Sequence, residues 1–168
     1  MDIALVPAGQ SVRAAQELAA LLQACVADGA SLGFLHPTTA EQARAFWQGA
    51  LTQPGAMTWV ARDDDRRLLG TVRLIPSPMP NAGHRADVAK LMVHPAARGR
   101  GVAAALMAAL EDAARATGRT LLVLDTETGS RAEAVYRRWG WERVGVIPDY
   151  ATDPGGALRP TTIMTKRL

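Results

Sequence analysis

Apolar residues recur at helical spacing in the first third of the chain and predict two helices. The first is expected over residues 11–27, where Ser11 can cap the start and Asp28-Gly29 ends it. Its apolar stripe would consist of Val12, Ala15, Ala19, Leu22 and Val26. The segment 39–42 has the Thr-x-x-Gln form of a capping box, so a second helix is expected from there through Phe46 and Trp47.

The rest of the chain alternates between strand-like and helix-like segments. Short apolar runs predict strands at 3–6, 57–62, 68–75, 84–93, 120–126, 141–147 and 161–166, and helical spacing predicts helices at about 101–117 and 130–139. Prolines and glycines predict loops at 76–83 and 148–160. This order predicts a mixed α/β fold in one domain over residues 1–168, with a central sheet of about six to seven strands and helices on both faces.

Composition narrows the classes of function. Cys25 is the only cysteine of 168 residues, so we expect no intramolecular disulfide and no metal site, and Cys25 itself reads as a small core residue. No apolar run approaches the ~18–20 residues of a membrane helix, and the first residues lack a signal-peptide pattern. The net charge of +3 is modest and spread along the chain, which argues against nucleic-acid binding. A cytoplasmic protein without a membrane partner is therefore expected.

The segment 93–103 has the composition of an anion-binding turn. An apolar strand stops at His94-Pro95, Arg98-Gly99-Arg100-Gly101 follows, and a helix begins near Val102. The first N–H groups of a helix have no intrahelical partner, and the helix dipole adds partial positive charge there. Glycines let the backbone approach a pyrophosphate, Ala103 keeps the first turn slim, and the two arginines add charge. The lysine and hydroxyl residue of a nucleotide-hydrolysing P-loop are missing. The simpler alternative is a tight turn with solvated arginines.

Two motifs resemble those of the GCN5-related N-acetyltransferase (GNAT) superfamily. Residues 98–103, Arg-Gly-Arg-Gly-Val-Ala, are similar to its Arg/Gln-x-x-Gly-x-Gly/Ala signature. Residues 132–141 resemble its second block, Ala-x-x-x-Tyr-x-x-x-Gly-Phe. The segments 124–129, 144–151 and 166–168 resemble the subgroup related to the tabtoxin-resistance acetyltransferase. One departure is Gly129, where many members of the superfamily carry asparagine.

The resemblance implies a fold, a cofactor and a reaction. The sheet is expected to splay between its fourth and fifth strands, and acetyl-CoA is expected to lie in that gap and to give its acetyl group directly to an amine. A backbone N–H near Met92 or Val93 would polarise the thioester, and Tyr136 would protonate the leaving thiolate. The alternative role for Tyr136 is core packing. The implied cofactor-binding residues are Leu91, Met92, Val93, Arg98, Gly99, Arg100, Gly101, Val102, Ala103, Gly129, Ala132 and Tyr136.

Asp87 is the candidate base, because some members of the superfamily carry a catalytic carboxylate four residues before the position of Leu91. Strict alternation would put Asp87 on the same face of the strand as Leu91. The alternative is a solvated or salt-bridged aspartate. In that case the base would be sought among His84, His36, Glu127 or ordered water.

The expected substrate is the primary amine of a small molecule, since the loops at 76–83 and 148–160 could wall off a small pocket. The alternatives are a protein N-terminus or lysine, or a non-catalytic acyl-CoA sensor on the same fold. Members of the superfamily are often dimers, so a homodimer is also expected.

Overall fold

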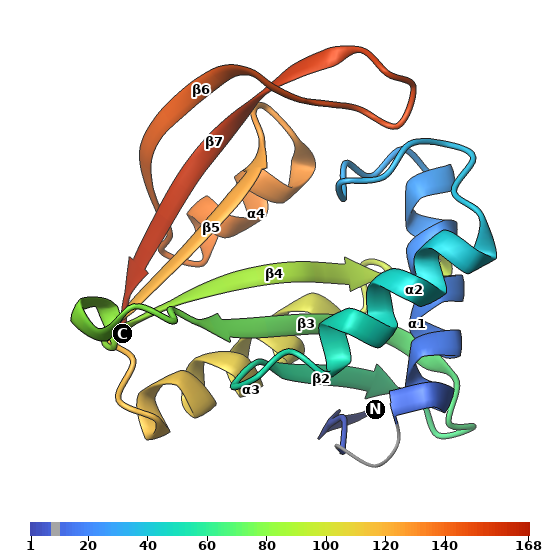
Figure 1. Ribbon diagram of the computed structural model, residues 1–168, viewed down its shortest axis with the longest axis horizontal. Helices are drawn as coiled ribbons and strands as arrows, with labels where there is room; N and C mark the ends of the chain where they lie inside the picture. The colour runs from blue at the N-terminus through green and yellow to red at the C-terminus, as the bar shows by residue number, and fades with distance from the viewer. Residues whose placement is uncertain (8–10) are drawn as a thin grey trace.

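The computed structural model describes residues 1–7 and 11–168. Its strands form one sheet in the order β1-β2-β3-β4-β5-β7-β6 (Figure 1). The strands are β1 (Asp2–Leu5), β2 (Met57–Arg62), β3 (Leu68–Pro76), β4 (Arg85–Val93), β5 (Leu121–Glu127), β6 (Glu142–Thr152) and β7 (Leu158–Arg167). The helices are α1 (Ser11–Ala27), α2 (Ala40–Leu51), α3 (Val102–Ala116) and α4 (Arg131–Arg138), with single 3₁₀ turns at Pro80–Ala82 and Pro95–Ala97.

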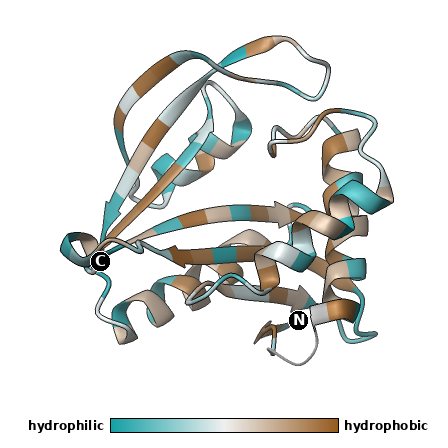
Figure 2. Ribbon diagram, viewed as in Figure 1, coloured by the Kyte–Doolittle hydropathy of each residue, from teal (hydrophilic) through white to brown (hydrophobic). Residues whose placement is uncertain are grey.

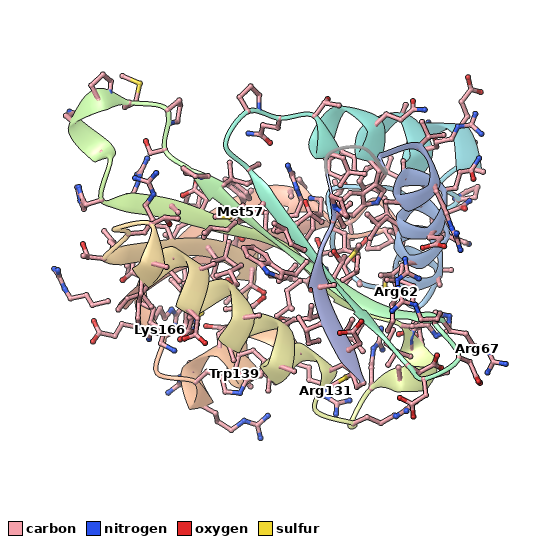
Figure 3. The ribbon with its side chains drawn as sticks, turned by 90° about the horizontal axis from the view of Figure 1, so that it is seen from below. Met57, Arg62, Arg67, Arg131, Trp139 and Lys166 are labelled. Carbon is pink, nitrogen blue, oxygen red and sulfur yellow. The ribbon has the colours of Figure 1, made fainter. Side chains whose placement is uncertain are left out.

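Two hydrophobic clusters cover the two faces of the sheet, as the sequence predicts. One cluster joins α3 and Tyr136 of α4 to the strands, with Leu106 and Leu110 at its centre. The other joins α1 and α2 to the opposite face, with Leu18 and Trp47 fully buried. Lys166 near the end of β7 lies beside α3 (Figure 3). Its Nζ is 2.6 Å from an oxygen of Glu111 in that helix, and this ion pair ties α3 to the sheet.

The N-terminal helices form largely as predicted. Thr39 and Gln42 make both hydrogen bonds of the capping box, which starts α2. The predicted stripe of α1 is buried except for Val12, which is 67% exposed and therefore does not belong to it. Val12 lies in the first turn, before the helix meets the sheet. The expected capping side chain, Ser11, lies outside the described side chains. In the part of the chain that the structure describes, no helix is long and apolar enough to cross a membrane.

The sheet splays between β4 and β5, as the resemblance implies. These parallel strands pair only at Arg85 with Leu121, Ala86 with Leu122 and Asp87 with Val123. Beyond that point β4 stays with β3, whereas β5 stays with β7, so the two halves of the sheet diverge (Figure 1). The edge of β4 from Val88 onward is therefore left without a strand partner on this side.

A bulge in β4 overturns the predicted alternation of its side chains. Thr71 pairs with Met92 and Arg73 with Ala89, so β4 contains one residue more than β3 in this stretch. Lys90 takes the left-handed conformation with φ of +53°. Before the bulge Val88 faces the α3 cluster, and after it Leu91 does. Asp87 therefore lies on the face of α1 and α2, and not on the same face as Leu91.

The segment 148–160 is not the loop that the sequence suggests. Strand β6 runs on through Tyr150 to Thr152, and β7 already starts at Leu158, so the hairpin tip is short. Pro148 is tolerated because β6 is an edge strand and the register shifts between Ile147 and Ala151. The extended pairing carries the hairpin tip out over the diverging strands (Figure 1).

The predicted loop at 76–83 lies at the other end of β4 from this tip, so the two do not enclose a common pocket (Figure 1). It closes the β3–β4 connection, where Ser77 N–H donates to the carbonyl of Arg85. The segment between α1 and α2 meets the tip instead, because His36 N–H donates to the carbonyl of Pro154 at 2.9 Å.

Candidate active site

The turn between β4 and α3 has the geometry of an anion site. His94 accepts a hydrogen bond from Ala96 N–H through Nδ1 and so caps a 3₁₀ turn after the strand. Gly99 and Gly101 follow with φ of +76° and +78°, a conformation that favours glycine. Apart from its own chain neighbours, no atom of the described residues lies within 4 Å of the place where either glycine would carry a Cβ, so open space borders both.

The N-terminus of α3 supplies donors to this space. The first intrahelical bond runs from Ala105 N–H to the carbonyl of Gly101, so the N–H groups of residues 102–104 precede it. The side chain of Val102 is buried, which leaves its backbone as the part that can reach a ligand. Residues 99–103 therefore fit a pyrophosphate through the backbone rather than through side chains.

The two predicted arginines differ in their surroundings. Arg100 is exposed. Arg98 forms an ion pair with Asp28 at the end of α1, beside Cys25. Burial raises the pKa of the Cys25 thiol, whose Sγ contacts the carbonyl of Val93, so Cys25 is a core residue as predicted. A pyrophosphate would have to compete with Asp28 for Arg98.

Residues 91–93 lie at the end of β4, the lower arm of the gap in Figure 1. Their edge toward β5 has no strand partner, because the β4–β5 pairing stops at Asp87. Leu91 and Val93 pack against the α3 cluster, and Met92 packs against α1 and α2. The side chains of these residues thus hold the strand in place from both faces of the sheet, and the backbone along its edge is left without a strand partner toward the gap.

Tyr136, the candidate proton donor, lies in α4 and belongs to the hydrophobic cluster on the α3 face of the sheet. Ser130 caps this helix, and Glu133 accepts a 2.6 Å hydrogen bond from Gly129 N–H, which fixes the turn before it. The ring of Tyr136 is 9% exposed and packs edge-on against Trp139 and Trp141. Burial raises the pKa of Tyr136 well above its usual value, and the negative charge of Asp125 adds to the shift. The phenol is therefore neutral, as a proton donor must be. Ala132, the other predicted residue of this block, is exposed in the first turn of α4.

Asp87 marks the point where β4 and β5 part. Its carboxyl loses part of its hydration, which raises its pKa, and Arg85 opposes this rise while Asp125 adds to it. The other predicted bases lie elsewhere. His84 precedes β4 and is exposed, and His36 lies exposed in the α1–α2 segment. Glu127 ends β5.

The structure adds three charged residues that sequence reasoning missed. Asp125 of β5 lies close enough to Asp87, Lys90 and Tyr136 to shift the pKa of each. Lys90 lies over the ring of Phe46, with Nζ 5.1 Å from its centroid. The third is Arg73 of β3, which is buried beneath α2.

Two of these residues could have been noticed in the sequence, because each interrupts the pattern expected of a strand. Asp125 interrupts an apolar strand, and Lys90 stands where alternation breaks before the apolar pair Leu91-Met92.

Comparison with known proteins agrees with this geometry. Residues 16–141 match the model of the acetyltransferase (GNAT) family. An uncharacterized N-acetyltransferase in the hisH-hisA intergenic region of Azospirillum brasilense is 31% identical over 107 residues, which span 62% of this chain and 63% of that protein.

Two solved structures share the fold. A GCN5-related N-acetyltransferase from Kribbella flavida has a TM-score of 0.79 and 25% identity over 99% of this chain and 97% of that one. The protein yncA from Salmonella typhimurium, solved with its cofactor acetyl-CoA, has a TM-score of 0.77 and 17% identity over 100% of this chain and 94% of that one. Because the family model covers most of the sequence, the chain belongs to the acetyltransferase (GNAT) family.

Proposed function

We propose that this protein transfers the acetyl group of acetyl-CoA directly to the primary amine of a small molecule. The observation that carries the proposal is the gap between β4 and β5. A glycine-rich turn with open space beside it follows β4, Asp87 lies at the last paired position of β4 and β5, and Asp125 is close enough to Asp87 and Tyr136 to raise the pKa of both. The gap thus combines a cofactor anchor with groups that can move protons.

In the proposed complex, the backbone of residues 99–103 holds the pyrophosphate, and the open edge of residues 91–93 pairs with the pantetheine arm. A backbone N–H near Met92 or Val93 then donates to the thioester oxygen, where negative charge develops. The relation to yncA, which binds acetyl-CoA, supports this choice of cofactor. Gly129 and Ala132 would border the cofactor from the start of α4.

The side chains supply the proton transfers. Asp87 accepts the proton of the ammonium, directly or through water, so that the free amine can attack. Tyr136 donates its phenolic proton to the departing sulfur. Its buried ring keeps the phenol neutral at the moment when a donor is needed.

The contact between the α1–α2 segment and the tip of the β6–β7 hairpin favours a small-molecule acceptor over a protein segment. The α1–α2 segment and the hairpin tip meet through the His36–Pro154 hydrogen bond, and the side chain of Pro154 is buried. A protein N-terminus or lysine would need this contact to open.

The expected homodimer stays a prediction. The strand β6 is exposed along its whole length and carries hydrophobic stretches, so it offers a surface for contact with a second copy (Figure 2).

The proposed function is tested by following CoA release and acetylated product with acetyl-CoA and a panel of amines. The panel holds amino acids, their carboxamides, decarboxylated amines, short peptides and a lysine-rich protein. Turnover of a small amine supports the proposal, and turnover of peptides or protein alone moves the assignment to protein acetylation. Tight acetyl-CoA binding without turnover of any amine would instead identify an acyl-CoA sensor.

Asp87→Asn should lower kcat/KM most at neutral pH. An amine with a pKa near 10 is almost wholly protonated there, so the reaction needs a proton acceptor that the amide cannot replace. As pH rises, more free amine is present, and the variant should partly recover. The wild type should lose activity only in acid, as Asp87 is protonated through a pKa raised above its usual value.

The pH profile of kcat/KM for both forms checks this prediction. Asp64→Asn, at a fully exposed position in the β2–β3 turn, is the matched control and should keep the wild-type profile. A wild-type profile in Asp87→Asn would make Asp87 structural and return the search to His84, His36, Glu127 or ordered water.

A further inference from the structure

We propose that the acceptor carries an acidic group besides its amine, and that Arg73 and Lys90 bind this group. The inference rests on the proposed acetyl transfer and names its substrate class, a short amino acid. It draws on a set of cations on the α1/α2 face of the gap that the acetyl-transfer mechanism does not use.

Arg73 is a buried cation without an ionic partner. Its side chain is held by three neutral acceptors, the carbonyl of Ala50 at 2.6 Å, Gln53 Oε1 at 2.9 Å and Thr58 Oγ1 at 3.3 Å. Within the described part of the chain, no carboxylate lies within 4.0 Å of its nitrogens. Burying a guanidinium without a counter-charge is costly, so its retention at 3% exposure calls for a partner.

Arg73 borders an open hollow that is large enough for such a partner. The hollow of about 590 Å³ lies along α2 and is lined by Ala45, Phe46, Gly49, Ala50, Thr52, Gln53, Pro54 and Arg73. Phe46 connects this hollow to Lys90, whose Nζ lies over the same ring. The two cations also lie close enough for Arg73 to lower the pKa of Lys90.

Lys90 holds a conformation that costs free energy. A lysine with φ of +53° is strained relative to glycine, and such strain is typical of functional positions. The bulge turns Lys90 toward the segment between α1 and α2. The Nζ of Lys90 lies close to Gly33 of that segment, 4.0 Å from the position that a Cβ of this glycine would take. No ion pair within 4.0 Å engages Lys90 among the described residues, so its ammonium has no anionic partner there.

The strand register sets these cations close to the proposed base. Arg73 lies opposite Ala89, and Asp87 lies opposite Ile75, so Arg73 and Asp87 are diagonal neighbours on one face, roughly 7–8 Å apart at the backbone. Cations thus stand beside the carboxylates of Asp87 and Asp125. This pattern is complementary to a zwitterion whose ammonium points to Asp87 and whose carboxylate points to Lys90 and Arg73.

The cofactor is a poor alternative partner for these cations. Its pyrophosphate is assigned to residues 99–103, beyond the end of β4, whereas Arg73 lies beneath the end of α2. A purely structural role, in which Arg73 only ties α2 to the sheet, makes a different prediction. In that case the enzyme would not distinguish an acid from its neutral analogue.

The test compares free L-amino acids with their carboxamides as acceptors. Each pair has the same side chain, and only the carboxylate differs. We expect the wild type to prefer the acid, and the ratio of kcat/KM for acid over carboxamide to fall by about 10- to 100-fold in Lys90→Met, the effect of losing one hydrogen bond to a charged group. Arg44→Gln, which removes an exposed charge from α2, is the control and should keep the wild-type ratio.

The outcomes separate this inference from the proposed function. Transfer to carboxamides or decarboxylated amines at least as fast as to the acids overturns the acidic acceptor while acetyl transfer stands. The same preference in Lys90→Met and the wild type also overturns it. Arg73→Gln is a second test: it should raise KM for the acid, provided that the circular dichroism of the variant matches that of the wild type. Binding of acetyl-CoA without transfer to any amine contradicts both proposals.

Discussion

Gly101→Asp is expected to lower the affinity for acetyl-CoA by about 10²-fold or more, since several charge-assisted hydrogen bonds are lost together. The new carboxylate would stand in the open space beside the N-terminus of α3, where the pyrophosphate is proposed to bind. Its charge would repel the phosphates and satisfy the helix donors itself. Calorimetric titration with CoA measures the effect.

The variant should still fold, which makes the result interpretable. Aspartate is among the residues that tolerate a φ near +78°, and it is a favourable residue before a helix. Gly118→Asp is the matched control, because Gly118 follows the other end of α3 with φ of +74° and open space around it. Unchanged affinity in a folded Gly101→Asp protein would remove the cofactor from this turn.

The glycine-rich turn before α3 could be predicted from sequence because its determinants are local. Glycines at 99 and 101 next to a helix start dictate both the left-handed backbone and the free N–H groups. The capping box at Thr39 and the buried stripe of α1 beyond Val12 were predictable for the same reason, since helical periodicity lies within a few neighbouring residues.

The bulge at Lys90 could not be predicted by alternation, because a single extra residue reverses every later side chain of β4. That reversal moved Asp87 away from the face of Leu91. The length of β6 was missed for a related reason. Pro148 argues against a strand, yet an edge strand with a shifted register accommodates it.

The charged residues around the gap come together only through the fold. Asp125, Lys90 and Arg73 belong to three different strands, and their separation in the sequence gives no sign of their proximity. The contact between His36 and Pro154 is equally non-local. Sequence reasoning therefore singled out the glycine-rich turn and Tyr136 as candidates, whereas the charged residues of the proposed acceptor side came to light only in the structure.

Tyr136→Phe is expected to lower kcat by roughly 10²-fold or more, the usual scale of acid–base assistance. The phenyl ring keeps its edge-on contacts with Trp139 and Trp141, so stability and cofactor affinity should change little. Only the hydroxyl is lost, and with it the proton for the leaving sulfur. Steady-state turnover together with calorimetric titration separates the loss of chemistry from a loss of binding.

The pH dependence distinguishes this role from that of Asp87. The raised pKa of Tyr136 keeps its phenol protonated throughout the assay range, so the loss in Tyr136→Phe should be the same from neutral to mildly alkaline pH. The loss in Asp87→Asn should instead shrink as pH rises. Tyr150→Phe, at the exposed second tyrosine, is the control and should keep wild-type turnover. If Tyr136→Phe turns over like the wild type while chemistry limits the rate, the ring serves packing alone, and another donor must protonate the thiolate.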